Sequence, residues 1–236
     1  MSLIVAIYTH EGIVLASDSR LTYNSTKNET DGSKTILQGT HFTDTVYKTF
    51  CSEKGVGISY CGDADVNGIP LSVEIEQFLR EHKQDGVEKI KDDILGYFKA
   101  LCSTLDTEFF VAGYEINDKG LPTQHLYRIN ILQNSIEPLD TSTQGIIWGG
   151  HKNIISRLLS SLYLKNDDGS YTQHTENEVL WNYFTIQDAI DYARYAIQVT
   201  IDTMRFQKVV KTVGGSIDLL VIKPEGTKWI CRKELH

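Results

Sequence analysis

Residues 1–20 read MSLIVAIYTHEGIVLASDSR, and this stretch decides the fold. Two apolar or β-branched runs, at 3–8 and 12–17, flank the Gly-containing loop THEG, a pattern that predicts a β-hairpin. The first run is almost continuously hydrophobic, so we expect both faces of that strand to be covered. Ordering a chain end costs conformational entropy. We therefore expect contacts to hold Ser2, the residue before this strand, in a fixed position.

The composition favours a folded protein with protein or small-molecule partners. The 236 residues are 41% hydrophobic and 10% aromatic, enough to bury a sizeable core, and the formal net charge is -8. An acidic chain argues against a nucleic-acid partner or an anionic membrane surface. The start has no basic segment before its short apolar run, and no run approaches the roughly 18 apolar residues of a membrane span. We expect a cytoplasmic protein with four reduced cysteines.

The remaining elements follow from hydrophobic periodicity and turn residues. Amphipathic patterns predict helices from Leu71 and from Val87, and Thr185 with Asp188 predicts a capping box that opens a long helix. Further strands are expected at 46–51, 55–61, 108–116, 125–132, 145–148, 216–222 and 228–231, with a helix at 151–164.

The order of these elements predicts an α+β fold. Strands joined as hairpins alternate with groups of helices, which indicates antiparallel sheets with segregated helices. The polar stretches 22–44 and 166–178 are expected to be exposed loops. We find no linker and no repeat, so residues 1–236 are expected to form a single domain.

Common catalytic signatures are absent from the sequence. It contains no GxxxxGK[ST], GxGxxG, HExxH or GxSxG motif and no His or Cys pair at metal-ligand spacing, so neither cofactor nor metal is expected. The segment WGGH at 148–151 has two interpretations. It is either a Gly-rich anion-binding turn or a strand-to-helix turn that needs glycine.

Three collinear motifs carry a family resemblance: GIVLASDSRLTYNS from residue 12, TVYKTF from 45 and ISYCGDAD from 58. They resemble the motifs of proteasome β-type subunits and their bacterial relatives. Ser2 and Asp18 lie 16 residues apart and Lys48 and Gly62 lie 14 apart, as in that family. The resemblance implies the fold of the N-terminal nucleophile (Ntn) hydrolases, a four-layer αββα sandwich of two antiparallel sheets flanked by helices.

The resemblance also implies a catalytic site. After removal of Met1, Ser2 would be the nucleophile and its own α-amine the base. Asp18 would orient Lys48, the Lys48 cation would favour a neutral amine, and the Gly62 amide would stabilise the oxyanion. The reaction would be peptide hydrolysis through an acyl-enzyme, without a cofactor. Each residue also has a structural interpretation: an unprocessed second residue, a turn acid, a solvated lysine and a positive-φ glycine.

The chain departs from the family pattern at its supporting positions. WGGH stands where the family has a serine in a Gly-Ser-Gly turn, and Val210 and Val213 stand where it has an acid and a serine. Asp202 is a candidate for the missing acid. These departures keep two alternatives open: a non-catalytic scaffold subunit, and an amidohydrolase for small amides.

The expected partners also come from the resemblance. They are a peptide or unfolded-protein substrate, further copies of the chain in a homo-oligomeric ring, and an ATP-dependent unfoldase. Neither nucleic acid nor a membrane is expected.

Overall fold

The opening hairpin lies at the centre of a five-stranded antiparallel sheet in the computed structural model, which describes residues 2–28, 33–173 and 179–234. β1 (Leu3–Thr9) pairs with β2 (Gly12–Ser17), and the order of the sheet is β12-β1-β2-β15-β16. Its other strands are β12 (Gly145–Gly150), β15 (Asp218–Lys223) and β16 (Gly226–Cys231). We call it the β1 sheet. Every residue of β2 is buried, as expected for a strand with both faces covered.

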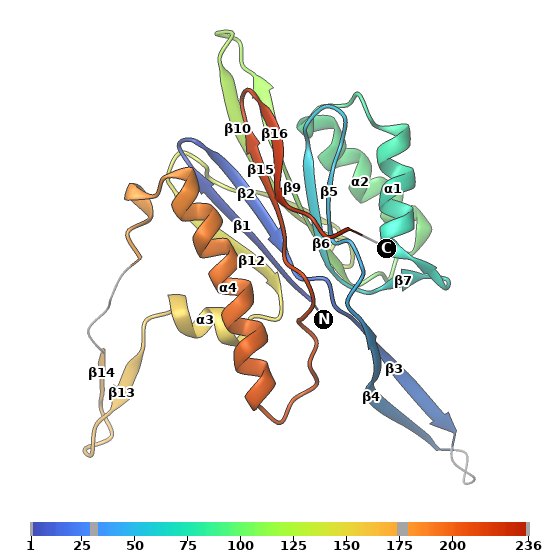
Figure 1. The fold of residues 1–236 in the computed structure, drawn as a ribbon, viewed down its shortest axis with the longest axis vertical. Coiled ribbons are helices and arrows are strands. Elements are labelled where there is room, and N and C mark those ends of the chain that lie inside the picture. Colours follow the sequence, from blue (N-terminus) through green and yellow to red (C-terminus); the bar gives the residue numbers. More distant parts are fainter. Residues whose placement is uncertain (1, 29–32, 174–178, 235–236) are drawn as a thin grey trace.

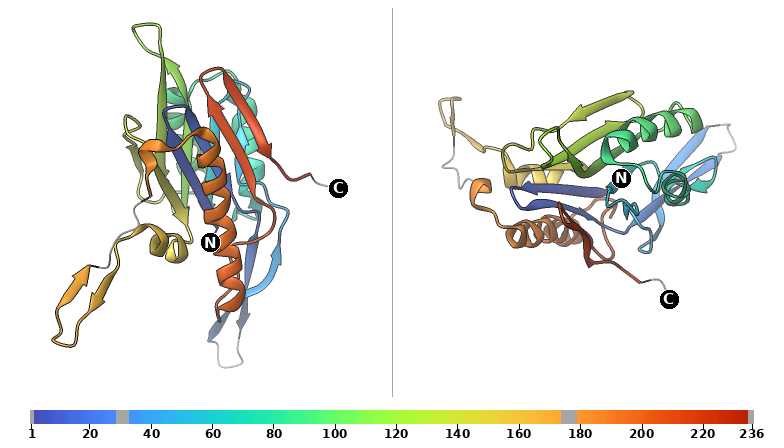
Figure 2. Two further views of the ribbon diagram at one scale, coloured as in Figure 1. Left: turned by 60° about the vertical axis from the view of Figure 1, so that its left-hand side comes forward. Right: turned by 90° about the horizontal axis from the view of Figure 1, so that it is seen from above.

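A second five-stranded antiparallel sheet, the β9 sheet, packs against the first (Figure 2). Its order is β11-β10-β9-β6-β5. The strands are β5 (Thr49–Cys51), β6 (Gly57–Gly62), β9 (Thr107–Ile116), β10 (Pro122–Asn130) and β11 (Ser135–Pro138). Ile4 and Leu15 of the β1 sheet share one buried cluster with Phe110 of the β9 sheet, so apolar burial holds the two sheets together.

Helices cover the outer faces of both sheets (Figure 1). α1 (Leu71–Glu81) and α2 (Val87–Leu101) pack on the β9 sheet, where Phe78, Phe98 and Phe109 are fully buried. α4 (Ile186–Phe206) packs on the β1 sheet together with α3 (Asn153–Leu159). The expectation of antiparallel sheets combined with helices is therefore confirmed. The prediction of one domain over the whole chain stays a prediction.

The predicted capping box of α4 is confirmed. The Thr185 hydroxyl accepts a hydrogen bond from the Asp188 amide (3.2 Å), and the Asp188 carboxylate accepts one from the Thr185 amide (2.8 Å). Two of the amides that a helix start leaves without helical partners are thereby satisfied. Neither α4 nor any other helix in the described part of the chain combines the length and apolarity that a membrane crossing requires.

The stretch 22–44, expected to be a loop, is a projecting hairpin of β3 (Leu21–Asn28) and β4 (Lys34–Thr43) (Figure 1). Residues 29–32 lie outside the described part. Hydrophobic periodicity does not reveal this hairpin, because the sequence of 22–44 has no regular alternation of apolar and polar residues. Arg20 and Asp44 join the two strands at their base through hydrogen bonds of 2.7 Å.

Other boundaries also differ from the prediction. The helix expected at 151–164 ends at Leu159, and residues 163–165 form β13 (Tyr163–Lys165), which pairs with β14 (Tyr171–Gln173) inside the expected loop 166–178. Residues 174–178 of that loop lie outside the described part. Short elements that the patterns did not predict are β7 (Asp65–Val66), β8 (Ile69–Pro70), β11 and the 3-10 helix η1 (Trp181–Tyr183).

Removing the α4 cap tests the contribution of the capping box. We expect Thr185→Ala to lower the free energy of unfolding by about 1 kcal/mol, since it leaves helix-start amides without a side-chain acceptor. Urea unfolding measures the change. Thr203→Ala, inside the same helix, is the matched control and is expected to be neutral or slightly stabilising. Equal losses in both variants would contradict a capping role.

Candidate active site

A buried ion pair stands at the end of the opening hairpin. Asp18 directly follows β2 and Lys48 directly precedes β5, so the two residues come from different sheets. The Lys48 Nζ lies 2.7 Å from Asp18 Oδ1, and the two side chains are 1% and 0% exposed. Lys48 Nζ also donates to the Arg20 carbonyl at 2.5 Å. Since an unpaired buried charge is costly, each residue depends on the other.

The Asp18 carboxylate also binds the backbone on both sides. Oδ1 accepts a hydrogen bond from the Leu3 amide (3.0 Å), and Oδ2 accepts from the amides of Arg20 (3.1 Å) and Gly214 (3.0 Å). Charge-assisted bonds of this kind are stronger than neutral ones. The start of β1, directly after Ser2, is therefore bonded to the same carboxylate oxygen as the Lys48 ammonium.

The segment WGGH holds the backbone of Ser2. Ser2 is 6% exposed, and its carbonyl accepts a hydrogen bond from the His151 amide at 2.6 Å. Gly150 has φ +85°, and a Cβ there would lie 1.9 Å from the Ser2 carbonyl oxygen. The glycine is required because the two backbones approach so closely. Of the two interpretations of WGGH, the strand-to-helix turn describes this contact, since β12 ends at Gly150 and α3 begins at Asn153.

Gly62 ends β6 in a conformation that glycine favours. Its φ is +124°, and a Cβ would lie 2.1 Å from the Asp106 carbonyl oxygen, so the backbone by itself requires glycine. The preceding residue, Cys61, is buried and adjoins the turn that holds Ser2: a Cβ on Gly150 would lie 3.3 Å from the Cys61 Cβ. The oxyanion role of Gly62 stays a prediction.

Burial dominates the electrostatics of this region. It lowers the pKa of Lys48, while the charge of Asp18 and its hydrogen bond oppose that change. Burial raises the pKa of the Cys61 thiol, which keeps the thiol protonated and a poor nucleophile. By geometry, the ion pair of Lys48 and Asp18 is the charged pair bonded to the start of β1.

The structure also places the supporting positions. Val213 is buried, and the amide of the next residue, Gly214, donates to Asp18. Asp202 is exposed on α4, where it accepts a hydrogen bond from Gln198 (3.1 Å), so it does not reach the ion pair. The Gly214 contact was not foreseen from the sequence. The pair Gly214–Gly215 was the available signal, because adjacent glycines permit a close backbone approach.

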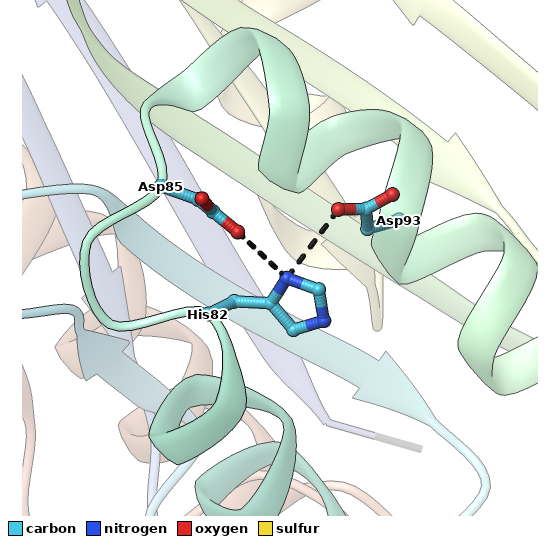
Figure 3. Close-up of side chains that lie close together, drawn as sticks. All are labelled: His82, Asp85 and Asp93. Atoms are coloured by element: carbon cyan, nitrogen blue, oxygen red, sulfur yellow. Dashed lines mark hydrogen bonds and ion pairs between the residues drawn. The ribbon is translucent and has the colours of Figure 1, made fainter.

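A second group of potential ligand atoms joins α1 to α2 (Figure 3). His82 Nδ1 lies 2.9 Å from Asp85 Oδ2 and 3.3 Å from Asp93 Oδ2. Lys89 Nζ lies 2.8 Å from Asp85, and this hydrogen bond lowers the pKa of the Asp85 carboxyl. The Lys89 ammonium already supplies a cation to these carboxylates, so the contacts are explained as helix-to-helix ion pairs.

The two packed antiparallel sheets with outer helices fit a proteasome-related fold. One solved structure with this likeness is the Anbu (Gly-1) mutant from Hyphomicrobium sp. strain MC1, with a TM-score of 0.57 over 99% of this chain and 86% of that chain. Anbu is a protein of the proteasome-like Ntn-hydrolase fold. The sequence identity is 14%, so the likeness concerns the fold alone.

The assignment to the proteasome β-type subunit family is wrong. No family model matches the chain, and no curated protein matches it. In this chain the motifs around Asp18, Lys48 and Gly62 supply a buried acid, its paired lysine and a positive-φ glycine. A fold alone does not establish the function of such residues.

Removing Lys48 should destabilise the protein strongly. Lys48→Met leaves the Asp18 carboxylate buried without its counter-ion, for which we expect a loss of about 3–5 kcal/mol in the free energy of unfolding. Urea unfolding at pH 7 measures the loss. Lys89→Met, which breaks an exposed ion pair, is the control and should change stability little. A Lys48 variant as stable as this control would contradict the burial of the pair.

Gly150 tests the contact that holds Ser2. Gly150→Ala places a methyl group against the Ser2 carbonyl and strains a positive φ, so we expect a loss of stability of about 1–3 kcal/mol. Thermal unfolding measures the effect. Gly96→Ala is the control: this glycine lies inside α2 with open space around its Cβ position, and the substitution should stabilise by up to about 1 kcal/mol. An unchanged stability in Gly150→Ala would contradict this prediction, because it would show that the turn adjusts to the added methyl group.

Proposed function

We propose that this protein is an amide hydrolase of the Ntn type, with Ser2 as its nucleophile once Met1 has been removed. The proposal includes the four-layer αββα arrangement of that class. It is supported by the cluster between the two sheets and by the helix-covered outer faces of both. The proteasome-related fold is consistent with this chemistry.

One observation carries the proposal. Asp18 Oδ1 accepts hydrogen bonds both from Lys48 Nζ and from the amide directly after Ser2. A carboxylate shared in this way couples the ammonium group to the start of β1. It supports a role for Lys48 in the electrostatics of the Ser2 amine and hydroxyl.

The chemistry requires only this chain's residues. A free α-amine has a pKa of about 7.7–8.0, and a nearby cation such as Lys48 lowers it, so much of the amine is neutral near pH 7. The amine accepts the Ser2 hydroxyl proton while Oγ attacks the amide carbonyl, and the Gly62 amide donates to the oxyanion. A donor of that kind contributes roughly 3–4 kcal/mol. The amine then protonates the departing nitrogen, and water releases the acyl group.

Peptides are the proposed substrates, and a ring-type homo-oligomer is the proposed assembly. The proteasome-related fold supports the assembly. The unfoldase partner stays a prediction, since no described residue bears on it.

Intact mass spectrometry before and after treatment with a β-lactone tests the proposal. We expect loss of Met1 and one adduct on Ser2, because the lactone acylates a terminal hydroxyl that has its own base. Ser2→Ala should form no adduct and Ser2→Thr should keep it. The matched control, Ser142→Ala in an exposed turn, should react like the native chain. The protein must be expressed without added N-terminal residues.

Retention of Met1 together with the absence of an adduct would overturn the proposed hydrolase function. That outcome would favour the non-catalytic scaffold, which the buried Val213 in place of a polar supporting residue would also fit.

A further inference from the structure

A second buried Asp–Lys pair lies beside the first. The Lys233 ammonium pairs with Asp218 Oδ2, and the Lys233 amide donates to Asp218 Oδ1 at 2.8 Å. The Asp218 side chain is 0% exposed and that of Lys233 is 6% exposed. Asp218 is the first residue of β15 and stands opposite Ser17, the residue before Asp18. Lys233, in the segment after β16, is thus bonded to Asp218, which pairs with the last residue of β2 directly before Asp18.

The same segment also contacts the residue before Lys48. The Tyr47 hydroxyl donates to the Lys233 carbonyl at 3.0 Å, and Lys233 Nζ lies 4.4 Å from the centre of the Tyr47 ring. Arg232 stacks on the same ring at 4.8 Å. Two cations on one aromatic ring add favourable contacts to the hydrogen bond. Lys233 therefore touches both Asp218 and the chain that leads into Lys48.

Hydrogen bonds between hydroxyl groups hold the residue that follows Lys48. Thr49, the next residue, donates to the Ser17 hydroxyl at 2.8 Å and lies 2.9 Å from the Ser59 hydroxyl. All three side chains are buried. Lys48 is thereby held on both sides: Thr49 is bonded to Ser17, and Tyr47 is bonded through Lys233 to Asp218, which stands opposite Ser17.

We propose that Lys233 is a positioning residue for Lys48, acting with Asp218 to hold Tyr47 and Lys48 against the strand end that carries Asp18. Its effect on catalysis rests on the proposed function, but the coupling between the two lysines does not. The structural observation is the continuous set of contacts from Asp218 through Lys233 to Tyr47.

The charge of Lys233 predicts the direction in which its removal changes the pKa of Lys48. Burial has the largest effect on the pKa of Lys48 and lowers it, Asp18 raises it, and Lys233 lowers it further. Lys233 itself faces Asp218, Asp18 and Arg232. Neutralising Lys233 removes a neighbouring cation and leaves Asp218 as an anion. Both changes favour the protonated form, so the pKa of Lys48 should rise.

The experiment compares Lys233→Gln and Lys233→Arg with the native full chain. NMR titration of isotopically labelled lysines, with Lys48→Arg to assign the resonance, reports the pKa of Lys48. We expect the pKa of Lys48 to shift upward in Lys233→Gln and to return toward the native value in Lys233→Arg. Lys228→Gln, an exposed lysine on β16, is the matched control and should leave the titration unchanged.

The rate of β-lactone adduct formation, followed against pH, gives the second reading. Loss of the Lys48 charge at high pH should lower this rate. In Lys233→Gln we expect the rate to fall at a higher pH than in the native chain, in agreement with the NMR titration. A variant that melts earlier but keeps the native Lys48 titration and pH profile would reduce Lys233 to a purely structural role and overturn the inference. If the native protein forms no adduct while the Lys48 pKa still shifts, the proposed function fails and the coupling stands.

Tyr47→Phe covers the case in which Lys233→Gln does not fold. It removes the hydrogen bond to Lys233 and keeps every charge. Positioning predicts a displaced Lys48 side-chain resonance in Tyr47→Phe, and a resonance identical to the native one would overturn it.

Discussion

The buried pair of Asp18 and Lys48 is the constraint on which the rest of the site depends. Two charges with almost no exposure are tolerable only when their hydrogen-bonding capacity is satisfied. The Asp18 carboxylate meets that requirement with partners from separate parts of the chain: Leu3, Arg20, Lys48 and Gly214. Each partner must lie within hydrogen-bond reach, so the ends of β1, β2, β5 and the segment before β15 meet at one place.

This meeting point lies where the two sheets pack against each other. Asp18 extends from the β1 sheet and Lys48 leads into the β9 sheet, while Thr49 of the β9 sheet donates to Ser17 of the β1 sheet across the same gap. Deeper in, the gap is filled by apolar side chains such as Ile4, Leu15 and Phe110. Apolar burial supplies most of the driving force for stacking, and the polar groups at this end define how the sheets align.

The comparison with Anbu separates fold from chemistry. A likeness that covers 99% of this chain at 14% identity shows that the backbone arrangement tolerates nearly complete replacement of the sequence. The likeness says nothing of the side chains at this chain's own site, where Val213 is buried and a second acid–lysine pair, Asp218 with Lys233, stands beside the first. Activity must therefore be established from the site itself.

The sequence by itself determined the elements with a buried face. The strands from Leu3 and Gly12, the helices from Leu71 and Val87, and the Thr185 cap could all be predicted, because burial imposes a period on the residues and a cap is a local motif. The hairpin within 22–44 could not, since its sequence has no regular alternation of apolar and polar residues. The family resemblance pointed to Asp18 and Lys48 as site residues, but a sequence motif does not give the distance between their side chains.

Only the tertiary structure decided that one carboxylate joins Leu3, Lys48 and Gly214, and that Lys233 contacts Tyr47. These partners are separated by up to 196 residues along the chain. Sheet stacking and the strand register bring them together, and neither leaves a local signal in the sequence.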